Sequence, residues 1–200
     1  MDKKILLHFQ SVDPILASLI EKVGPLTISK STDYFFHLCR EIIGQQLSGK
    51  VADVIFARFE KLFSHKKITP QTVLKYSEET LRSTGMSWSK TRFIRDLAQT
   101  VVNKDINLEQ LAQRNNEEVI KELTKVKGIG PWTAEMFLMF TLGREDIFSH
   151  GDLGLRRAIQ KLYHFKKEPT RKQIEKISRK WSPYRTYACR ILWNSLDQKG

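Results

Sequence analysis

The chain has 200 residues, of which 34 are Lys or Arg and 22 are Asp or Glu, so its formal net charge is +12. This charge indicates a polyanionic partner, and an apolar fraction of 40% is enough to bury a core, which excludes a disordered chain. No apolar run approaches the ~18 residues of a membrane span, and the apolar stretch after Lys4 is too short for a signal peptide. We therefore expect a soluble, intracellular protein without a membrane partner, in the cytoplasm or nucleoid, or in the nucleus of a eukaryote.

The cysteine content is low. Cys39 and Cys189 are too few for a disulfide framework, a four-cysteine zinc site or an iron–sulfur cluster. We expect both to be reduced thiols in the core.

The positive charge is concentrated toward the C-terminus. Residues 1–49 hold five basic and five acidic side chains, whereas residues 153–190 hold twelve basic side chains and two acidic ones, Glu168 and Glu175. A Lys-rich run is often only a solvated surface. The asymmetry over a whole segment favours a surface that binds phosphates.

Helix signals follow one another along the chain, and no strand pattern is convincing. Ser31-Thr32-Asp33 is expected to cap a helix over 34–43, and Ser48 to cap a second helix through Phe63. The expected inner face of the second helix consists of Val51, Val54, Ile55, Phe59 and Leu62.

The same signals continue beyond Thr69-Pro70, where a short helix is expected to begin. Further helices are predicted from Ser77 to a stop at Gly85, over 88–102, in a short turn over 107–112, and over 117–123. About ten short helices with brief connections indicate a single all-α domain over residues 1–200. No repeat or flexible linker marks a domain boundary.

Residues 123–135 read Leu-Thr-Lys-Val-Lys-Gly-Ile-Gly-Pro-Trp-Thr-Ala-Glu, a helix end, a turn over two glycines and a new helix over 132–142. Gly128 and Gly130 permit positive φ and close backbone approach, and Pro131 suits the first helical turn. The unpaired N–H groups of such a helix start form an anion site, so a DNA phosphate fits against residues 128–134. A tight corner between two helices without a ligand is the alternative.

A second informative segment, residues 147–157, reads Ile-Phe-Ser-His-Gly-Asp-Leu-Gly-Leu-Arg-Arg. Asp152 precedes a helix that begins near Leu153, so its local pattern is that of a helix N-cap. The neighbouring glycines, the basic helix that follows and the upstream glycine turn also permit a functional aspartate.

Together these two segments resemble the helix-hairpin-helix and Gly/Pro-Asp signature of a DNA glycosylase superfamily, and most closely its alkylpurine (3-methyladenine) branch. The agreement extends to Ile-Ile-Gly-Gln-Gln-Leu-Ser at 42–48 and to residues 181–188, so the resemblance covers most of residues 12–196. It implies a compact, two-lobed helical glycosylase fold with a DNA cleft between the lobes. The helix-hairpin-helix would span about 117–142 and the catalytic Gly-Asp loop about 147–153.

The resemblance assigns the catalytic role to Asp152, whose carboxylate would stabilise the oxocarbenium-like sugar and orient or deprotonate water. Trp132 stands where bifunctional members carry the lysine that forms a Schiff base. Because an indole cannot form an imine, we expect a hydrolase of the DNA-3-methyladenine glycosylase II type without AP lyase activity.

Further roles follow from the resemblance. The implied base pocket contains Trp132, Tyr184, Met136 and His150, although plain packing is an equal reading of Met136 and Tyr184 and a polar filler is the usual role of a lone histidine. Gln46 is the expected wedge that fills the gap left by a flipped base, with Leu47 as a second candidate. The expected DNA contacts also include Gly128, Gly130, Thr133, Arg156 and Arg157.

No cofactor is expected to be required for catalysis. The resemblance implies a monovalent cation, Na⁺ or K⁺, held by the backbone carbonyls of Thr124, Val126 and Ile129 and bridging to a DNA phosphate.

The sequence thus predicts a monomeric, monofunctional glycosylase that flips alkylated purines out of duplex DNA and hydrolyses their N-glycosidic bond, initiating base excision repair. One alternative is a protein of the same fold that binds DNA, or damaged DNA, without cutting it. Another is a glycosylase for a different damaged base.

Overall fold

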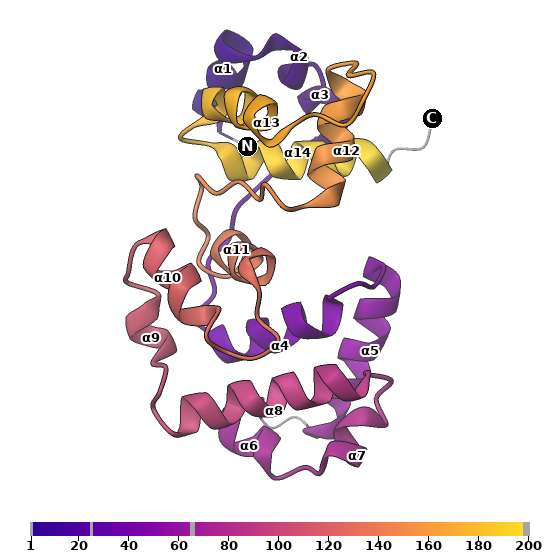
Figure 1. The fold of residues 1–200 in the computed structure, drawn as a ribbon, viewed down its shortest axis with the longest axis vertical. Coiled ribbons are helices and arrows are strands. Elements are labelled where there is room, and N and C mark those ends of the chain that lie inside the picture. Colours follow the sequence, from indigo (N-terminus) through magenta and orange to yellow (C-terminus); the bar gives the residue numbers. More distant parts are fainter. Residues whose placement is uncertain (1, 25, 65–66, 198–200) are drawn as a thin grey trace. The chain divides into compact units, whose positions relative to one another are not determined.

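The computed structural model describes residues 2–24, 26–64 and 67–197, and all regular secondary structure within them is helical (Figure 1). Fourteen α-helices and one 3-10 helix make up the regular structure of these residues. The predicted all-α class is therefore confirmed, with a finer division into helices than the sequence indicates. No helix in the described ranges is long and apolar enough to cross a membrane.

The chain forms two compact units. One combines the N-terminal residues up to Ser29 with the residues from Gly143 onward, and the other runs from Lys30 to Leu142. The predicted cleft between two lobes stays a prediction.

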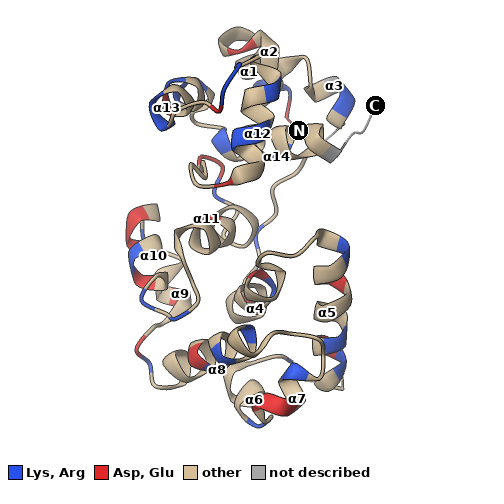
Figure 2. Cartoon of the chain, turned by 45° about the vertical axis from the view of Figure 1, so that its right-hand side comes forward, with Lys and Arg blue, Asp and Glu red and all other residues tan. Residues whose placement is uncertain are grey.

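The first unit joins the two ends of the chain. Its elements are α1 (Lys3–Val12), α2 (Pro14–Ala17), α3 (Ile20–Val23), α12 (Leu153–Leu162), α13 (Arg171–Ser178), the 3-10 helix η1 (Arg179–Trp181) and α14 (Arg185–Asp197). In this unit α12 packs on α14, and α1 packs on α2 and η1. Lys and Arg side chains are frequent along α12 and α13, as predicted for the C-terminal third (Figure 2).

A buried carboxylate links the N-terminal helices to the C-terminal ones. Asp13 is 4% exposed and accepts hydrogen bonds from the Leu16 N–H at 3.1 Å, the Tyr163 hydroxyl at 2.5 Å and the Trp181 indole at 2.9 Å. Burial, and then the contact with Asp13, raises the pKa of Tyr163, so this phenol stays a donor. Segments 150 and 168 residues apart in sequence are thereby fixed to one another.

We expect Asp13→Ala to lower the free energy of unfolding by about 2–4 kcal/mol, because the buried Trp181 indole and the partly buried Tyr163 hydroxyl lose their acceptor. Urea denaturation measures this change. The matched control is Asp53→Ala, which removes an exposed carboxylate paired with Arg40 and should cost less than about 1 kcal/mol. Equal effects of the two substitutions would contradict the structural role of Asp13.

The second unit is built around α4. Its elements are α4 (Tyr34–Gly44), α5 (Gly49–Leu62), α6 (Pro70–Leu74), α7 (Glu78–Arg82), α8 (Trp88–Val102), α9 (Leu108–Leu111), α10 (Asn116–Leu123) and α11 (Pro131–Phe140). α4 packs against α5, α8, α9 and α11, whereas α6 and α7 pack on α8. Cys39 of α4 and Cys189 of α14 are buried and form no disulfide, as predicted, and burial raises the pKa of the Cys39 thiol.

Most predicted helix starts are confirmed. Thr69 and Asn115 form capping boxes, and Ser77 and Asn107 accept hydrogen bonds from the third residue of their helices. Ser48 occupies the N-cap position of α5 without a side-chain capping bond. α11 begins at Pro131 and ends at Phe140, two residues before the predicted end.

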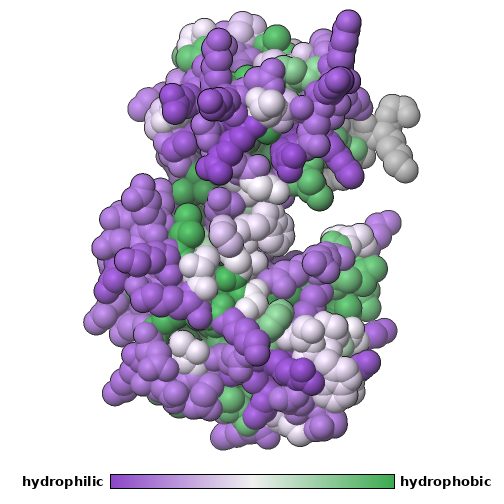
Figure 3. All heavy atoms as spheres, in the orientation of Figure 1, coloured by the Kyte–Doolittle hydropathy of each residue, from purple (hydrophilic) through white to green (hydrophobic). Residues whose placement is uncertain are grey.

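The predicted inner face of α5 is wrong in part. Val51 is 46% exposed and Val54 51% exposed, whereas Phe56 and Phe59 are buried. α5 carries two apolar stripes, and the aromatic one faces the core because its larger side chains bury more area. The rings of Phe56 and Phe59 lie 6.0 Å apart. The aliphatic stripe remains on the surface, where Figure 3 shows apolar atoms gathered over α5.

Candidate active site

The predicted helix-hairpin-helix is formed by α10 and α11, which pack against one another. In the turn between them Gly128 has φ +86°, whereas Gly130 has φ −93° and is the N-cap of α11. The expectation of positive φ therefore holds for Gly128 alone.

The two hairpin glycines have different surroundings. A Cβ on Gly128 would lie 2.1 Å from Cγ of Phe93, whereas a Cβ on Gly130 would meet no atom within 4 Å. No side chain caps α11, and Pro131 stands at its first turn. The start of α11 thus combines backbone N–H groups with an open surface, which suits an anion such as phosphate.

We expect Gly128→Ala to destabilise the fold by about 3 kcal/mol, because it adds left-handed strain to a clash with Phe93. Gly130→Ala should change stability by less than about 0.5 kcal/mol yet weaken binding to duplex DNA. Urea unfolding and fluorescence anisotropy with labelled DNA at fixed salt separate the two effects. Unchanged DNA binding by Gly130→Ala would argue against a phosphate at the hairpin.

The three carbonyls expected to hold a cation lie in this turn. Val126 O accepts the Ile129 N–H at 3.0 Å, whereas within the described ranges no backbone N–H bonds to Thr124 O or Ile129 O. Carbonyls with spare lone pairs fit a monovalent cation. The described residues contain no group of three or more His, Cys, Asp or Glu side chains that would hold a metal ion.

The predicted wedge lies on the short loop between α4 and α5. Gln46 is exposed at φ +58°, and Leu47 is partly buried. The loop is braced from two sides. Lys90 donates to Ile43 O at 2.8 Å and to Gln45 O at 2.6 Å, and Gln45 Nε2 donates to Gly128 O at 2.9 Å. Burial lowers the pKa of Lys90.

Trp132 and Thr133 occupy the first turn of α11. Trp132 is partly exposed and lines a cavity of about 230 Å³ together with Leu47. The Thr133 side chain is buried, and its Oγ1 accepts a hydrogen bond from Gln45 Nε2 at 3.1 Å. A phosphate contact by Thr133 is thus left to its backbone amide. Met136 is buried within the second unit.

Asp152 lies in the other unit, at the N-cap of α12, as its local sequence pattern predicts. Its Oδ1 accepts the Leu155 N–H at 2.7 Å and the Trp193 indole N–H at 3.0 Å. The residue is 9% exposed. Two donors from different helices fix the orientation of this carboxylate, so the capping role and a chemical role are compatible.

Sequence reasoning missed one neighbour of Asp152, the indole of Trp193. Trp193 lies 41 residues away on α14 and has no local signal. A Cβ on Gly154 would lie 3.0 Å from Asp152 Oδ1 and 3.2 Å from Trp193 Nε1, so glycine lets the indole reach the carboxylate. Gly154 lies in the first turn of α12 and is one of the glycines noted beside Asp152 in the sequence.

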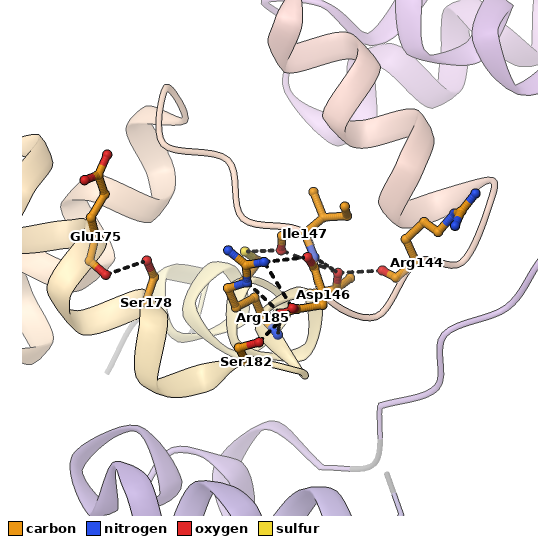
Figure 4. Close-up of polar contacts among 9 residues, drawn as sticks. Arg144, Asp146, Ile147, Glu175, Ser178, Ser182 and Arg185 are labelled. Carbon is orange, nitrogen blue, oxygen red and sulfur yellow. Dashed lines mark hydrogen bonds and ion pairs between the residues drawn. The ribbon is translucent and has the colours of Figure 1, made fainter. Parts of the chain in front are cut away.

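The segment before Asp152 is fastened to the start of α14 (Figure 4). Arg185 donates to Asp146 Oδ1 at 2.6 Å and to Oδ2 at 3.0 Å, and Ser182 donates to Oδ2 at 2.8 Å. Thr186 Oγ1 donates to Arg144 O at 2.6 Å and accepts the Ile147 N–H at 3.0 Å.

These bonds also set the charge of Asp146. Partial burial acts to raise the pKa of Asp146, but the hydrogen bonds from Arg185 and Ser182 outweigh it and hold the pKa below its usual value.

The other predicted pocket residues of this unit are Tyr184 and His150. Tyr184 is buried, with its ring centroid 5.2 Å from that of His8. His150 packs edge-on against Phe148 at 4.8 Å and lines a cavity of about 420 Å³ with Pro169 and other residues of the α12–α13 region.

Burial lowers the pKa of His150, and the charged groups that act on it are Glu175, Arg171 and Arg185. Asp152 is not among these groups.

The two predicted arginines of α12 differ in their contacts. Arg156 forms an ion pair with Glu168, whereas Arg157 is exposed. Arg157 thus has the more accessible guanidinium for a phosphate.

Comparison with known proteins relates the whole chain to DNA repair enzymes. DNA-3-methyladenine glycosylase 1 of Schizosaccharomyces pombe is 32% identical over 194 residues, covering 94% of this chain and 85% of the relative. Alkylbase DNA glycosidase-like protein mag2 of the same yeast is also 32% identical, covering 96% of this chain and 94% of the relative.

Two solved structures similar to this chain are also those of 3-methyladenine DNA glycosylases or glycosidases. The crystal structure of a DNA-3-methyladenine glycosidase from Bacillus halodurans superimposes with a TM-score of 0.82 at 34% identity, covering 98% of this chain and 91% of that one. The S. pombe 3-methyladenine DNA glycosylase Mag1 in complex with abasic DNA gives a TM-score of 0.86 at 31% identity, covering 98% and 97%.

The family model described as "HhH-GPD superfamily base excision DNA repair protein" matches residues 39–183, a range that contains both the hairpin and Asp152. The chain therefore belongs to the HhH-GPD superfamily of base excision DNA repair proteins.

Proposed function

We propose that the protein is a monofunctional DNA glycosylase that hydrolyses the N-glycosidic bond of alkylated purines, of the 3-methyladenine type, in duplex DNA. The observation that carries this proposal is the oriented carboxylate of Asp152 in a member of a base excision repair family. The names of the relatives, which are 3-methyladenine and alkylbase glycosylases, support the substrate class. The activity would initiate base excision repair.

Hydrolysis of the N-glycosidic bond of an alkylated purine requires few catalytic groups. Loss of a base leaves positive charge on the deoxyribose, and a nearby carboxylate stabilises that charge and orients or deprotonates the attacking water. An alkylated purine that already carries a positive charge is a good leaving group. In our proposal Asp152 supplies the carboxylate, and catalysis uses no metal or redox cofactor.

DNA binding and base flipping are assigned to the second unit and to the basic helices. Extruding a base costs a few kcal/mol of unstacking, and the exposed Gln46 on its braced loop would fill the gap. The first turn of α11 would hold a phosphate, with the carbonyls of Thr124, Val126 and Ile129 binding a monovalent cation beside it. Such a cation would supply positive charge to the phosphate. A single lesion needs no symmetric partner, so we propose a monomer acting on duplex DNA.

The nature of residue 132 supports hydrolysis without strand cleavage. Trp132 stands where bifunctional relatives carry an amine, and an indole forms no imine with the sugar. Its electron-rich face would attract a cationic purine.

We expect Asp152→Asn to reduce base release from methylated duplex DNA by about 100-fold or more. Asparagine is as good an N-cap as aspartate, so the variant should fold and retain DNA binding. Chromatography of the free base, with alkali treatment to reveal abasic sites, measures the reaction. Strand breaks should appear only after alkali.

Full activity of Asp152→Asn would refute the role of the carboxylate. Folded wild-type protein that binds methylated DNA but releases no base would instead favour a lesion-binding protein or a glycosylase for another damaged base.

We further expect Trp193→Phe to lower kcat about tenfold while KM for DNA changes little, because the ring is kept and one donor to the Asp152 carboxylate is lost. Trp88→Phe is the control, since Trp88 is 42% exposed on α8. A change in KM alone would mean that Trp193 binds DNA without orienting Asp152.

A further inference from the structure

A small cavity lies beside Trp132, entirely within the second unit. Its volume is about 230 Å³, and its wall is formed by α4, the loop after it, the first turns of α5 and the start of α11. The lining residues include Arg40, Glu41, Gly44, Leu47, Asp53 and Trp132. These helices are neighbours in the fold, because α4 packs on both α5 and α11 (Figure 2).

One acid in this cavity has no hydrogen-bond or ion-pair partner among the described residues. Arg40 and Asp53 form an ion pair at 2.7 Å, so their charges offset one another. The Glu41 carboxyl is partly buried, and within the described ranges no residue donates a hydrogen bond to it or pairs with it. An unpaired acid beside an aromatic ring is costly in the folded chain, and a cationic ligand or an N–H donor would relieve that cost.

Alkylated purines differ from other damaged bases in their charge. A purine methylated at a ring nitrogen such as N3 carries a positive charge before its bond to the sugar breaks, whereas hypoxanthine is neutral. An indole face attracts a cation more than a neutral ring. A carboxylate in the same cavity adds a charge that acts only on the cation.

We propose that Glu41 is a specificity-determining residue that acts together with Trp132 to favour cationic alkylated purines over neutral bases. This inference rests on the proposed function, since it requires the released base to reach the cavity lined by Trp132. It assigns a role to a residue outside the hairpin and the Gly-Asp loop.

The titration of Glu41 gives the inference a distinctive pH dependence. Burial raises the pKa of Glu41 to about 7, and the charge of Arg40 works against this rise. The other charged side chains on the wall are Arg40 and Asp53, and they are paired. The carboxylate form of Glu41, and with it the preference for cations, should therefore increase as the pH rises through about 7.

The same shift predicts the stability of the test variant. A carboxyl whose pKa is raised by folding stabilises the native state fully below its unfolded pKa and loses that contribution as the pH rises through about 7. Glu41→Gln keeps the shape of the side chain and removes this pH-dependent loss of stability. The variant should be at least as stable as wild type at pH 8, so a change in its selectivity is not a consequence of unfolding.

The experiment compares two free purines as inhibitors of 3-methyladenine release from methylated duplex DNA. One is the permanent cation 3,9-dimethyladeninium and the other is neutral 9-methyladenine. For wild type we expect the cation to inhibit about tenfold more strongly at pH 8, with a smaller preference at pH 6. Glu41→Gln should show a preference of about twofold or less at both pH values. The matched control, Glu60→Gln, should keep the wild-type preference, because Glu60 is exposed on α5 and does not line this cavity.

The outcomes separate the inference from the proposed function. If folded wild-type protein releases no methylated purine, the proposed function fails. If it releases 3-methyladenine but the two purines inhibit it equally, or Glu41→Gln keeps the preference and its pH dependence, the role of Glu41 alone is overturned.

Discussion

The carboxylate of Asp152 depends on donors from two helices that are distant in sequence. Leu155 of α12 and Trp193 of α14 both donate to Oδ1, and the glycine at 154 leaves room for the indole. The packing of α12 on α14 is therefore what orients this carboxylate, to which we assign the catalytic role. The ties from Arg185 and Thr186 to the segment before Asp152 come from the same helix, so α14 fixes both the aspartate and the chain that leads to it.

This dependence explains why the first unit contains both ends of the chain. Asp13 near the N-terminus accepts hydrogen bonds from Tyr163 and Trp181, and Arg190 of α14 donates to Thr27 O. The bond from Arg190 ties α14 to the segment after α3, and the bonds to Asp13 tie Tyr163 and Trp181 to the N-terminal helices. The unit that carries Asp152 thus requires the first turns of the protein, whereas the hairpin and the wedge loop belong to a continuous segment of 113 residues, Lys30–Leu142.

Local signals in the sequence predicted much of this structure. The caps at Thr69 and Asn115, the positive φ of Gly128 and the N-cap position of Asp152 are properties of a few consecutive residues, and each is confirmed. The errors and omissions concern features that depend on tertiary packing. α5 offers two apolar stripes, and only packing decides which one is buried. Trp193 contacts Asp152 across a separation of 41 positions in the sequence, and Glu41 shares a cavity with Trp132 across 91 positions. A short stretch of sequence cannot show contacts between residues so far apart.

The bracing of the α4–α5 loop by Lys90 and Gln45 has a consequence for the wedge role that we propose for Gln46. Ordering a loop costs about 1–2 kcal/mol of conformational entropy for each residue that is fixed. Since these hydrogen bonds form within the free protein, that entropy is lost once, during folding, and not again at every base pair that the protein tests. A wedge that is already ordered would contact a base pair and leave it without a local folding step. The protein would therefore stay only a short time at each undamaged site.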